Sequence, residues 1–433
     1  MIDFTIEPEF QEKLDWIRKF IDEEVEPLDV LTGYNSNASY DLTNQATVDI
    51  VKMLQEKVKA QGLWAPHLDR KLGGQGFGQA KLAFINEIVG RSNWGPRVFG
   101  AQAPDSGNSE ILARFGSEEQ KEKYLKPLLN GDIISCYSMT EPDQGSDPTT
   151  FKTTAVRDGD DWVINGEKWF SSNAKYAAFL ITPVMTHPDA ERHDRMTMFI
   201  VPTDTPGLRI IRNAGIWGES EEEASHGYVE YKNVRVPASC VLGEPGKGFQ
   251  VAQSRLGGGR IHHAMRTVGL CQKALEMAME RAVSRKTRGQ RLADLGVVQD
   301  QIGDWWAKLQ MFRLLVLHCA WLYDQERERE AYIETAAVKV MTADISKEII
   351  WGCAHLHGSL GASNEMRFGQ MVSSAFRMAI VDGPTEAHRA VLGRQLLKRV
   401  EPAPGDGRWP STHIPPMKEK AWEKYGAYFE KYA

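Results

Sequence analysis

Apolar residues recur at helical spacing in the first third of the chain. Val48, Val51, Leu54 and Val58 follow one another at intervals of three and four residues. This spacing places them on one face of a helix, because an α-helix repeats about every 3.6 residues. The pattern predicts a helix over 45–60, inside a helical domain over residues 1–133.

The pattern changes to that of strands over 134–247. Trp162-Val163-Ile164 stands between two turn signals, Asp158-Gly159-Asp160 and Asn165-Gly166, which predicts a meander of hairpins. The apolar runs 179–181 and 198–201 predict further strands. A loop rich in glycine, 243–248, ends this predicted β domain.

Helical spacing returns after Phe249. An apolar stripe at steps of three and four predicts a helix that packs against others; its members are Val268, Cys271, Leu275, Ala278 and Ala282. Further helices are predicted over 302–323 and 332–351, in a helical domain over 248–400, and 401–433 is expected to be an extended arm ending in a short helix. Helices, then strands, then helices predict an α+β fold with a β domain between two helical domains.

Composition narrows the class of protein. The chain has 433 residues, of which 42% are hydrophobic and 25% charged, as in a globular protein of two or three subdomains. It has no apolar run long enough for a transmembrane segment and no signal-peptide pattern at its acidic N-terminus. The simplest expectation is therefore the cytoplasm of a bacterium, or a mature organellar form.

Net charge and cysteine content exclude few further classes of protein. The formal net charge of −6 argues weakly against nucleic-acid binding. The five cysteines show no C-x-x-C spacing, so they are expected to be reduced thiols.

Two segments of the predicted β domain have the composition of a ligand site. Residues 137–147, Tyr-Ser-Met-Thr-Glu-Pro-Asp-Gln-Gly-Ser-Asp, offer backbone N–H groups and hydroxyls on a stiff turn, which suits a flat ring with polar edges. Residues 168–173, Lys-Trp-Phe-Ser-Ser-Asn, add aromatic rings. The simpler alternatives are a turn stabilised by Thr140 and Asp147, and a strand whose tryptophan packs in a core.

These segments, with the glycine-rich loop 72–78, resemble the acyl-CoA dehydrogenase family, and the resemblance extends over about residues 1–400. It implies an N-terminal helical domain, a middle β-barrel or sandwich domain and a C-terminal four-helix bundle. It also implies an FAD site, in which Trp169 packs against the flavin, Ser171 bonds near its N5, and Arg285 contacts the FAD pyrophosphate of a neighbouring subunit. The implied FAD-binding residues are Tyr137, Met139, Thr140, Gly145, Ser146, Trp169, Phe170, Ser171, Arg285, His355, Gly358, Ser359 and Pro384.

Some positions depart from the family pattern. Arg288 stands where the family has an aromatic residue, and Leu295-Gly296 where it has a polar pair. His355 and Ser359 depart from the family's Gln-x-x-Gly-Gly-x-Gly. No metal site is expected from His355 and His357, because no third ligand has a recognisable spacing.

Asp382 is the candidate catalytic base. Most of the family has Glu-Gly-Thr where this chain has Asp382-Gly383-Pro384, and the glutamate removes a proton beside a thioester. Asp-Gly-Pro resembles the motif at this position in the branch whose larger eukaryotic members carry a fused kinase-like domain. Gly257-Gly258-Gly259, where other members place the base, has no carboxylate, so the sequence shows no rival. The alternative is an Asp that caps the Gly-Pro bend.

The resemblance also implies a substrate site and a reaction. Its substrate-binding residues are Ser146, Leu256, Arg260 and Gly383. The three glycines either leave room for a long, branched or oxygenated acyl chain, or merely permit close helix packing. The implied reaction is FAD-dependent α,β-dehydrogenation of an acyl-CoA to a trans-2-enoyl-CoA, with Asp382 taking the α-proton and flavin N5 the β-hydride.

The implied partners are an electron-transfer flavoprotein and further copies of the chain, as a homodimer or homotetramer. Water exclusion around the acyl chain is expected to raise the pKa of the base. Three other functions stay open: processing of 4-hydroxyacyl-CoA phosphorylated by a separate kinase, a flavin oxidase of the acyl-CoA or nitroalkane type, and a DNA-associated flavoprotein.

Overall fold

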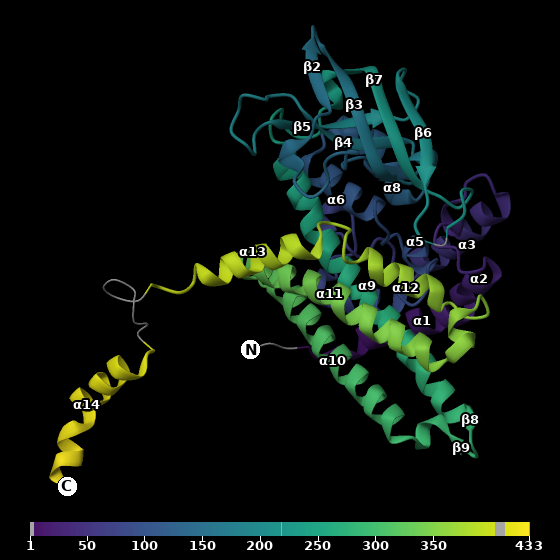
Figure 1. Cartoon of the computed structure of the whole chain (residues 1–433). Helices are drawn as coiled ribbons and strands as arrows, with labels where there is room; N and C mark the ends of the chain where they lie inside the picture. The colour runs from purple at the N-terminus through teal and green to yellow at the C-terminus, as the bar shows by residue number, and fades with distance from the viewer. Residues whose placement is uncertain (1–3, 218, 403–411, 433) are drawn as a thin grey trace. The chain divides into compact units, whose positions relative to one another are not determined.

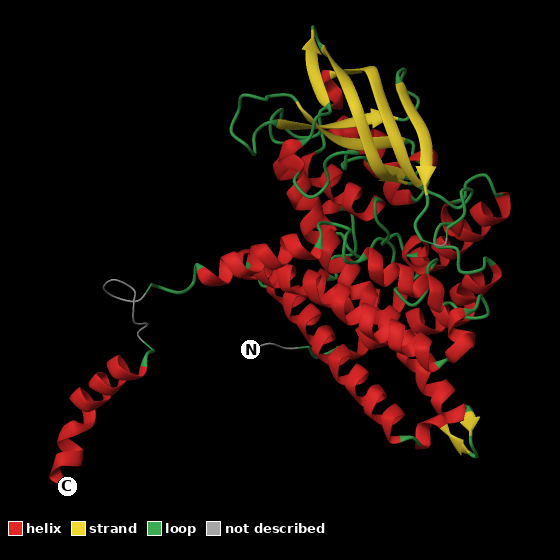
Figure 2. Ribbon diagram, viewed as in Figure 1, coloured by secondary structure: helices red, strands yellow, loops and turns green. Residues whose placement is uncertain are grey.

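The computed structural model describes residues 4–217, 219–402 and 412–432, and its N-terminal third is helical (Figures 1 and 2). The predicted helix over 45–60 is confirmed as α3, Gln45–Ala60. Its apolar face, with Leu54 fully buried, packs in a core with Ile17 and Trp94. The other helices here are α1 Pro8–Phe20, α2 Glu26–Leu31, α4 Gly78–Val89, α5 Gly95–Val98, α6 Asp105–Phe115, α7 Glu118–Gln120 and α8 Lys126–Asn130.

The middle of the chain is a single curled sheet. Its strands are β1 Ser135–Tyr137, β2 Thr154–Asp158, β3 Asp161–Ser172, β4 Phe179–Met185, β5 Met196–Pro202, β6 Leu208–Ala214 and β7 His226–Pro237. They lie in the order β1-β4-β2-β3-β7-β6, with β5 paired to β4. The predicted meander is wrong in part, because β4 pairs parallel with both β1 and β2. Parallel pairs need crossovers, which local turn signals do not reveal.

One turn signal is also wrong. Asn165-Gly166 does not end a strand; β3 runs through it with a shift of register against β7 between Ile164 and Gly166. Gly166 has a φ of 143°, and a Cβ there would lie 2.6 Å from Thr153 Oγ1. The glycine is therefore used for a bulge and a close approach, not for a hairpin turn.

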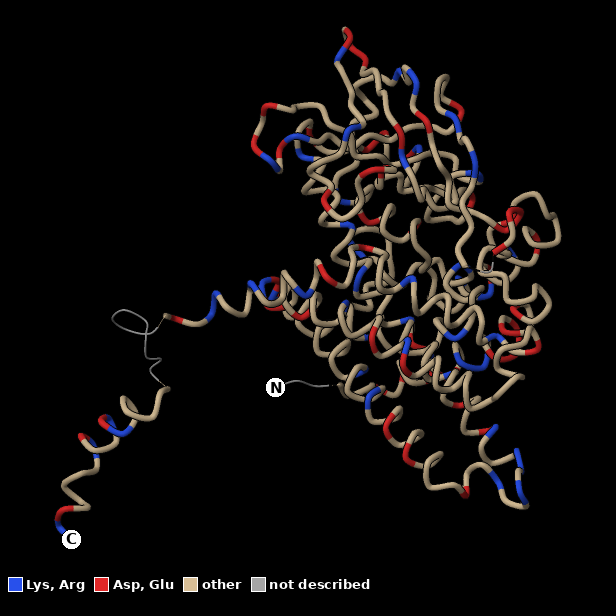
Figure 3. Tube along the Cα trace, viewed as in Figure 1, with Lys and Arg blue, Asp and Glu red and all other residues tan. Residues whose placement is uncertain are grey.

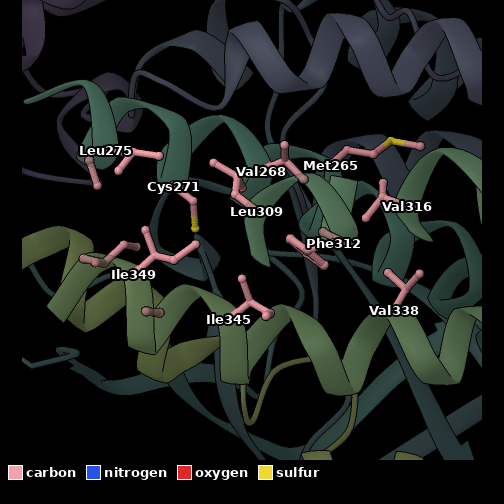
Figure 4. Packing of buried hydrophobic residues seen from close by; sticks show 14 of the residues in the cluster. Met265, Val268, Cys271, Leu275, Leu309, Phe312, Val316, Val338, Ile345 and Ile349 are labelled. Atoms are coloured by element: carbon pink, nitrogen blue, oxygen red, sulfur yellow. The ribbon is translucent and has the colours of Figure 1, made fainter. Parts of the chain in front are cut away.

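Long helices return after the sheet. The predicted stripe lies on α9, Gly248–Ser284, and the helices predicted over 302–323 and 332–351 lie within α10, Gly296–Asp324, and α11, Glu328–Leu356. Side chains of these helices point toward one another (Figure 4), and Cys271, Phe312 and Ile349 are among the buried residues that join them. The remaining elements of this region are β8 Lys286–Thr287, β9 Gln290–Arg291, α12 Phe368–Arg377 and α13 Thr385–Leu397.

The chain divides into two units, Met1–His388 and Arg389–Ala433. The second unit holds the end of α13 and α14, Ile414–Lys431. Part of the expected arm, 403–411, lies outside the described residues, and the helix that follows it is longer than expected, at 18 residues. No helix of the described chain is long and apolar enough to cross a membrane. All five cysteines are free thiols.

Candidate active site

Asp382 sits in a tight bend between α12 and α13. It has a φ of 55°, and Gly383 after it has a φ of 105°. Two side chains hold its backbone carbonyl: Arg260 Nε donates to that oxygen at 3.0 Å, and His388 Nε2 lies 3.2 Å from it. Aspartate tolerates the left-handed conformation better than most residues, so the bend accommodates a carboxylate here.

The carboxylate of Asp382 opens onto a small cavity. The cavity lies between α9 and the start of α6. Several of its wall residues are charged or polar; the walls consist of Ala103, Ser106, Gly107, Glu110, Arg255, Gly259, His262, His263, Arg266 and Asp382. Of these, the sequence singled out only Asp382 and Gly259, because no motif marks the rest.

Positive groups surround the Asp382 carboxylate. Arg255, Arg260 and Lys339 are the charged groups that act on it. His263 Nε2 lies 3.6 Å from Asp382 Oδ2, but burial lowers the pKa of His263 to about 4, so its ring is uncharged at neutral pH. Burial alone would raise the pKa of Asp382, but the positive groups outweigh burial and hold the pKa below its usual value. In the chain by itself the carboxylate is therefore ionised at neutral pH, and any rise in its pKa has to come from bound substrate.

Glu110 is a second carboxyl group in the same cavity, and the expectation that Asp382 has no rival needs correction. Burial raises the pKa of Glu110, against the opposing effect of Arg114 and Arg255. Arg114 Nε donates to Glu110 Oε1 at 3.1 Å. Glu110 comes from α6, far from Asp382 in sequence, so only the packing of α6 against α9 brings the two together.

The glycine run of α9 makes room for both carboxylates. A Cβ at Gly259 would lie 3.0 Å from Asp382 Oδ2, and one at Gly258 would lie 3.2 Å from Glu110 Oε2. Gly257 has open space around its Cβ position. The neighbours of Gly258 and Gly259 are thus acid groups rather than another helix, which favours the interpretation that these glycines shape the site.

The segment after β1 carries polar groups without partners, as a flavin cradle requires. The Tyr137 ring lies 3.8 Å from the Arg255 guanidinium, and its hydroxyl is buried without a hydrogen-bond partner. Met139 and Thr140 follow, with backbone N–H groups that contact no acceptor among the described residues. Gly145 and Ser146 are exposed beyond the turn at Glu141–Gln144. These donors fit the polar edge of an isoalloxazine ring.

The end of β3 separates its two serines. Ser171 is fully buried, and its hydroxyl lies 2.9 Å from Ser138 Oγ. The role of Ser171 near a flavin N5 stays a prediction; in this structure its hydroxyl is bonded to Ser138, next to a register shift of β3 between Lys168 and Ser171. Ser172 is only half-buried, with its Oγ 2.9 Å from His226 Nδ1.

The aromatic residues of this strand are placed for a planar ligand. Phe170 is 49% exposed and has a φ of 52°, so its ring is available at the surface of the sheet. Trp169 packs 5.1 Å from Tyr228 between ring centroids, and its Nε1 is buried without a partner.

Other predicted residues lie elsewhere. Leu256 and Arg260 are on α9, and Gly383 and Pro384 are in the bend after Asp382. Arg285 begins the exposed β8–β9 hairpin, where basic residues gather (Figure 3). His355, Gly358 and Ser359 are exposed near the end of α11. None of Arg285, His355, Gly358 and Ser359 lines the Asp382 cavity.

Comparisons with known proteins cover almost the whole first unit. The acyl-CoA dehydrogenase N-terminal, middle and C-terminal domain models match residues 7–132, 136–234 and 246–397. "Probable acyl-CoA dehydrogenase FadE2" of Mycobacterium tuberculosis is 39% identical over 81% of this chain and 86% of its own. Acyl-CoA dehydrogenase family member 11 of Mus musculus is 35% identical over 90% of this chain, which spans only 50% of that protein.

Solved structures agree. An acyl-CoA dehydrogenase structure from Mycobacterium abscessus has a TM-score of 0.84 and 38% identity, and covers 91% of this chain and 99% of its own. A glutaryl-CoA dehydrogenase of Mycobacterium smegmatis in complex with FADH2 has a TM-score of 0.75 at 23% identity, over 91% of this chain and 95% of its own. At that identity the second likeness concerns the fold alone.

Proposed function

Because this chain belongs to the acyl-CoA dehydrogenase family, we propose that it removes the α- and β-hydrogens of an acyl-CoA thioester to give a trans-2-enoyl-CoA. Members of the family are FAD-dependent oxidoreductases that act on CH–CH bonds. The observation that carries the proposal is the Asp382 carboxylate at the wall of the cavity between α6 and α9. Arg260 fixes its position by binding the backbone carbonyl of Asp382.

Asp382 is proposed to take the α-proton. Arg260 and His388 bind its backbone carbonyl, which fixes the bend while leaving the carboxylate oxygens directed at the cavity. An acyl chain that fills the cavity removes water from the carboxylate. This adds to its burial and raises its pKa toward that of a useful general base.

The flavin side of the site is proposed on the residues after β1 and at the end of β3. Bound FAD supplies the acceptor for the hydride that leaves the β-carbon. The unpartnered N–H groups of Met139 and Thr140 are proposed to bind its polar edge, with Phe170 against the ring. Ser172 is proposed as a second hydroxyl beside the flavin, next to Ser171, whose hydroxyl bonds to Ser138 in the chain by itself. Tyr137, Gly145, Ser146 and Trp169 keep the roles expected for them.

Two guanidinium groups in the cavity, which lie beside the carboxyl groups of Asp382 and Glu110, favour one variant of this function. An unsubstituted alkyl chain gains nothing from Arg255 and Arg266, which line the cavity together with His262 and His263. A phosphate on an acyl chain would pair with these guanidinium groups, because their fork matches phosphate oxygens. A 4-hydroxyacyl-CoA in its phosphorylated form is therefore the second candidate substrate. An electron-transfer flavoprotein is proposed as acceptor of the electrons in either case.

An anaerobic titration tests the function. The purified yellow protein is mixed with short, long, branched, 4-hydroxy and 4-phosphorylated acyl-CoAs, and loss of flavin absorbance is followed. Bleaching by simple acyl-CoAs supports dehydrogenation of unsubstituted chains, and bleaching or product formation only with 4-substituted chains supports the second candidate. No change with any of them, despite bound FAD, contradicts the proposal. Oxygen consumption with a reactive substrate would instead indicate an oxidase.

A further inference from the structure

A buried ion pair lies behind the residues assigned to the flavin. Lys168 Nζ is 2.9 Å from Glu141 Oε1, and the two side chains are 0% and 4% exposed. A buried pair is by itself weak evidence of stabilisation, because desolvation of the charges offsets their attraction. The role of the pair therefore depends on which segments of the chain it holds in place.

Lys168 binds the turn after β1 at several points. Its ammonium donates to the Met139 carbonyl at 2.9 Å as well as to Glu141, and it lies 4.1 Å from the centroid of the Phe151 ring. Glu141 in turn accepts from the backbone N–H groups of Lys152, at 2.6 Å, and Thr153, at 3.0 Å. The ion pair thus joins β3, the turn after β1 and the segment before β2.

The next residue of β3 binds the same turn. Trp169 N donates to the Thr140 carbonyl at 2.6 Å, so consecutive residues of β3 bind consecutive carbonyls of the turn. The N–H groups of Met139 and Thr140 have no acceptor within the described part of the chain. Fixed carbonyls and free donors are the arrangement expected of a pre-organised ligand cradle.

We propose that Lys168 is a positioning residue for FAD: through Met139 and Glu141 it holds the turn in the one conformation that presents the free N–H groups to the flavin. It touches no part of the flavin itself. The proposal rests on the FAD site proposed above and not on the acyl substrate, so it can fail separately from the assignment of Asp382.

The protonation of Lys168 should make the affinity for FAD depend on pH. Burial lowers the pKa of Lys168 to about 8, although Glu141 opposes this shift. As the pH rises through that value the ammonium loses its charge, the ion pair with Glu141 disappears, and the Met139 carbonyl loses its strongest donor. The affinity for FAD should therefore fall over the same range.

A matched pair of variants tests the proposal in the full chain depleted of FAD. Lys168→Met removes the buried ammonium. Lys152→Met removes an ion pair from the same turn, but an exposed one, since Lys152 and Asp143 are 69% and 71% exposed. FAD affinity and the visible spectrum of the bound flavin are measured. Lys168→Met should weaken FAD binding by about 10- to 100-fold, the range for a lost hydrogen bond to a charged group, and shift the spectrum; Lys152→Met should change affinity less than about twofold.

Two further measurements separate positioning from folding. Lys168→Met/Glu141→Gln removes both charges, so its apoprotein should melt closer to wild type than the single variant does, while its FAD affinity stays low because Met139 still lacks its donor. In the unaltered protein, FAD affinity should fall between pH 7 and 9. Unchanged FAD affinity in the folded single or double variant, or a flat pH profile in the unaltered protein, would overturn the proposal.

Discussion

At the residue scale, the assignment of the base depends on two carboxyl groups that share one cavity. Asp382 has a lowered pKa and Glu110 a raised one. The lowered pKa keeps Asp382 ionised before substrate arrives, so that it can accept a proton, whereas the raised pKa of Glu110 favours the form that carries the proton. This difference favours Asp382 as the base.

Replacing each carboxyl group by its amide tests that choice. Asp382→Asn keeps the positive φ of 55°, which asparagine tolerates, and should bind FAD normally while slowing flavin reduction by about 1,000-fold or more, the scale of general base catalysis. Glu110→Gln should reduce its flavin within about tenfold of the wild-type rate under the same conditions. Stopped-flow absorbance measures both rates; a larger loss in Glu110→Gln than in Asp382→Asn would exchange the two roles.

The lowered pKa of Asp382 also predicts a pH profile. Since the folded pKa lies below the ordinary value, the base stays ionised down to about pH 4, and its contribution is lost only as the pH falls further. The rate of flavin reduction at low substrate concentration should thus show no acid limb between about pH 5 and 8. Arg255→Gln removes a positive neighbour of Asp382, so it should move the acid limb to higher pH. An unmoved limb would show that another group titrates.

At the element scale, α9 uses glycine for two different purposes. Gly258 and Gly259 face the carboxylates, whereas Gly269 lies against α4: a Cβ there would be only 1.8 Å from the backbone oxygen of Glu87. The same residue type thus shapes the cavity in the first half of the helix and allows backbone contact near its middle.

A pair of alanine substitutions in α9 separates these effects. Gly269→Ala must push α4 and α9 apart and should lower the free energy of unfolding by about 2–3 kcal/mol. Gly257→Ala meets nothing within 4 Å and should raise it by about 0.5–1 kcal/mol, because alanine favours the helix. Thermal unfolding of both variants checks this. Equal melting temperatures would contradict the close packing of α4 on α9.

At the scale of the whole molecule, the predicted FAD residues other than Pro384 form two groups. One group surrounds the turn after β1 and the end of β3. The other, Arg285, His355, Gly358 and Ser359, is exposed and does not line the Asp382 cavity. The proposal that a second copy of the chain completes the FAD site accounts for this separation.

Binding of FAD should then depend on protein concentration. Dilution below the dissociation constant of the oligomer should release FAD, as followed by flavin fluorescence alongside sedimentation. Arg285→Gln should weaken FAD binding by about tenfold, the worth of a charged hydrogen bond, whereas Arg288→Gln on the same exposed hairpin should have little effect. A monomer that retains FAD at all dilutions would contradict a shared site.

Much of the fold followed from local patterns. The stripe in α3 and the apolar runs of β4 and β5 predicted those elements, because burial of one face imposes a period on the sequence. The crossovers around β4 and the bulge at Gly166 did not follow. Strand pairing joins segments that are distant in the chain, and a glycine beside an asparagine reads the same in a turn and in a bulge.

The chain's motifs alone determined the family resemblance, the candidate base Asp382 and the FAD-binding turn, since each lies within a few consecutive residues. The tertiary structure decided which groups meet them. It placed Glu110, Arg255 and His263 around the cavity, turned Ser171 into the interior and set Lys168 behind the turn. The physical reason is that pKa values, burial and hydrogen bonds depend on neighbours in space, and packing of α6 on α9 and of β3 on the turn chooses those neighbours.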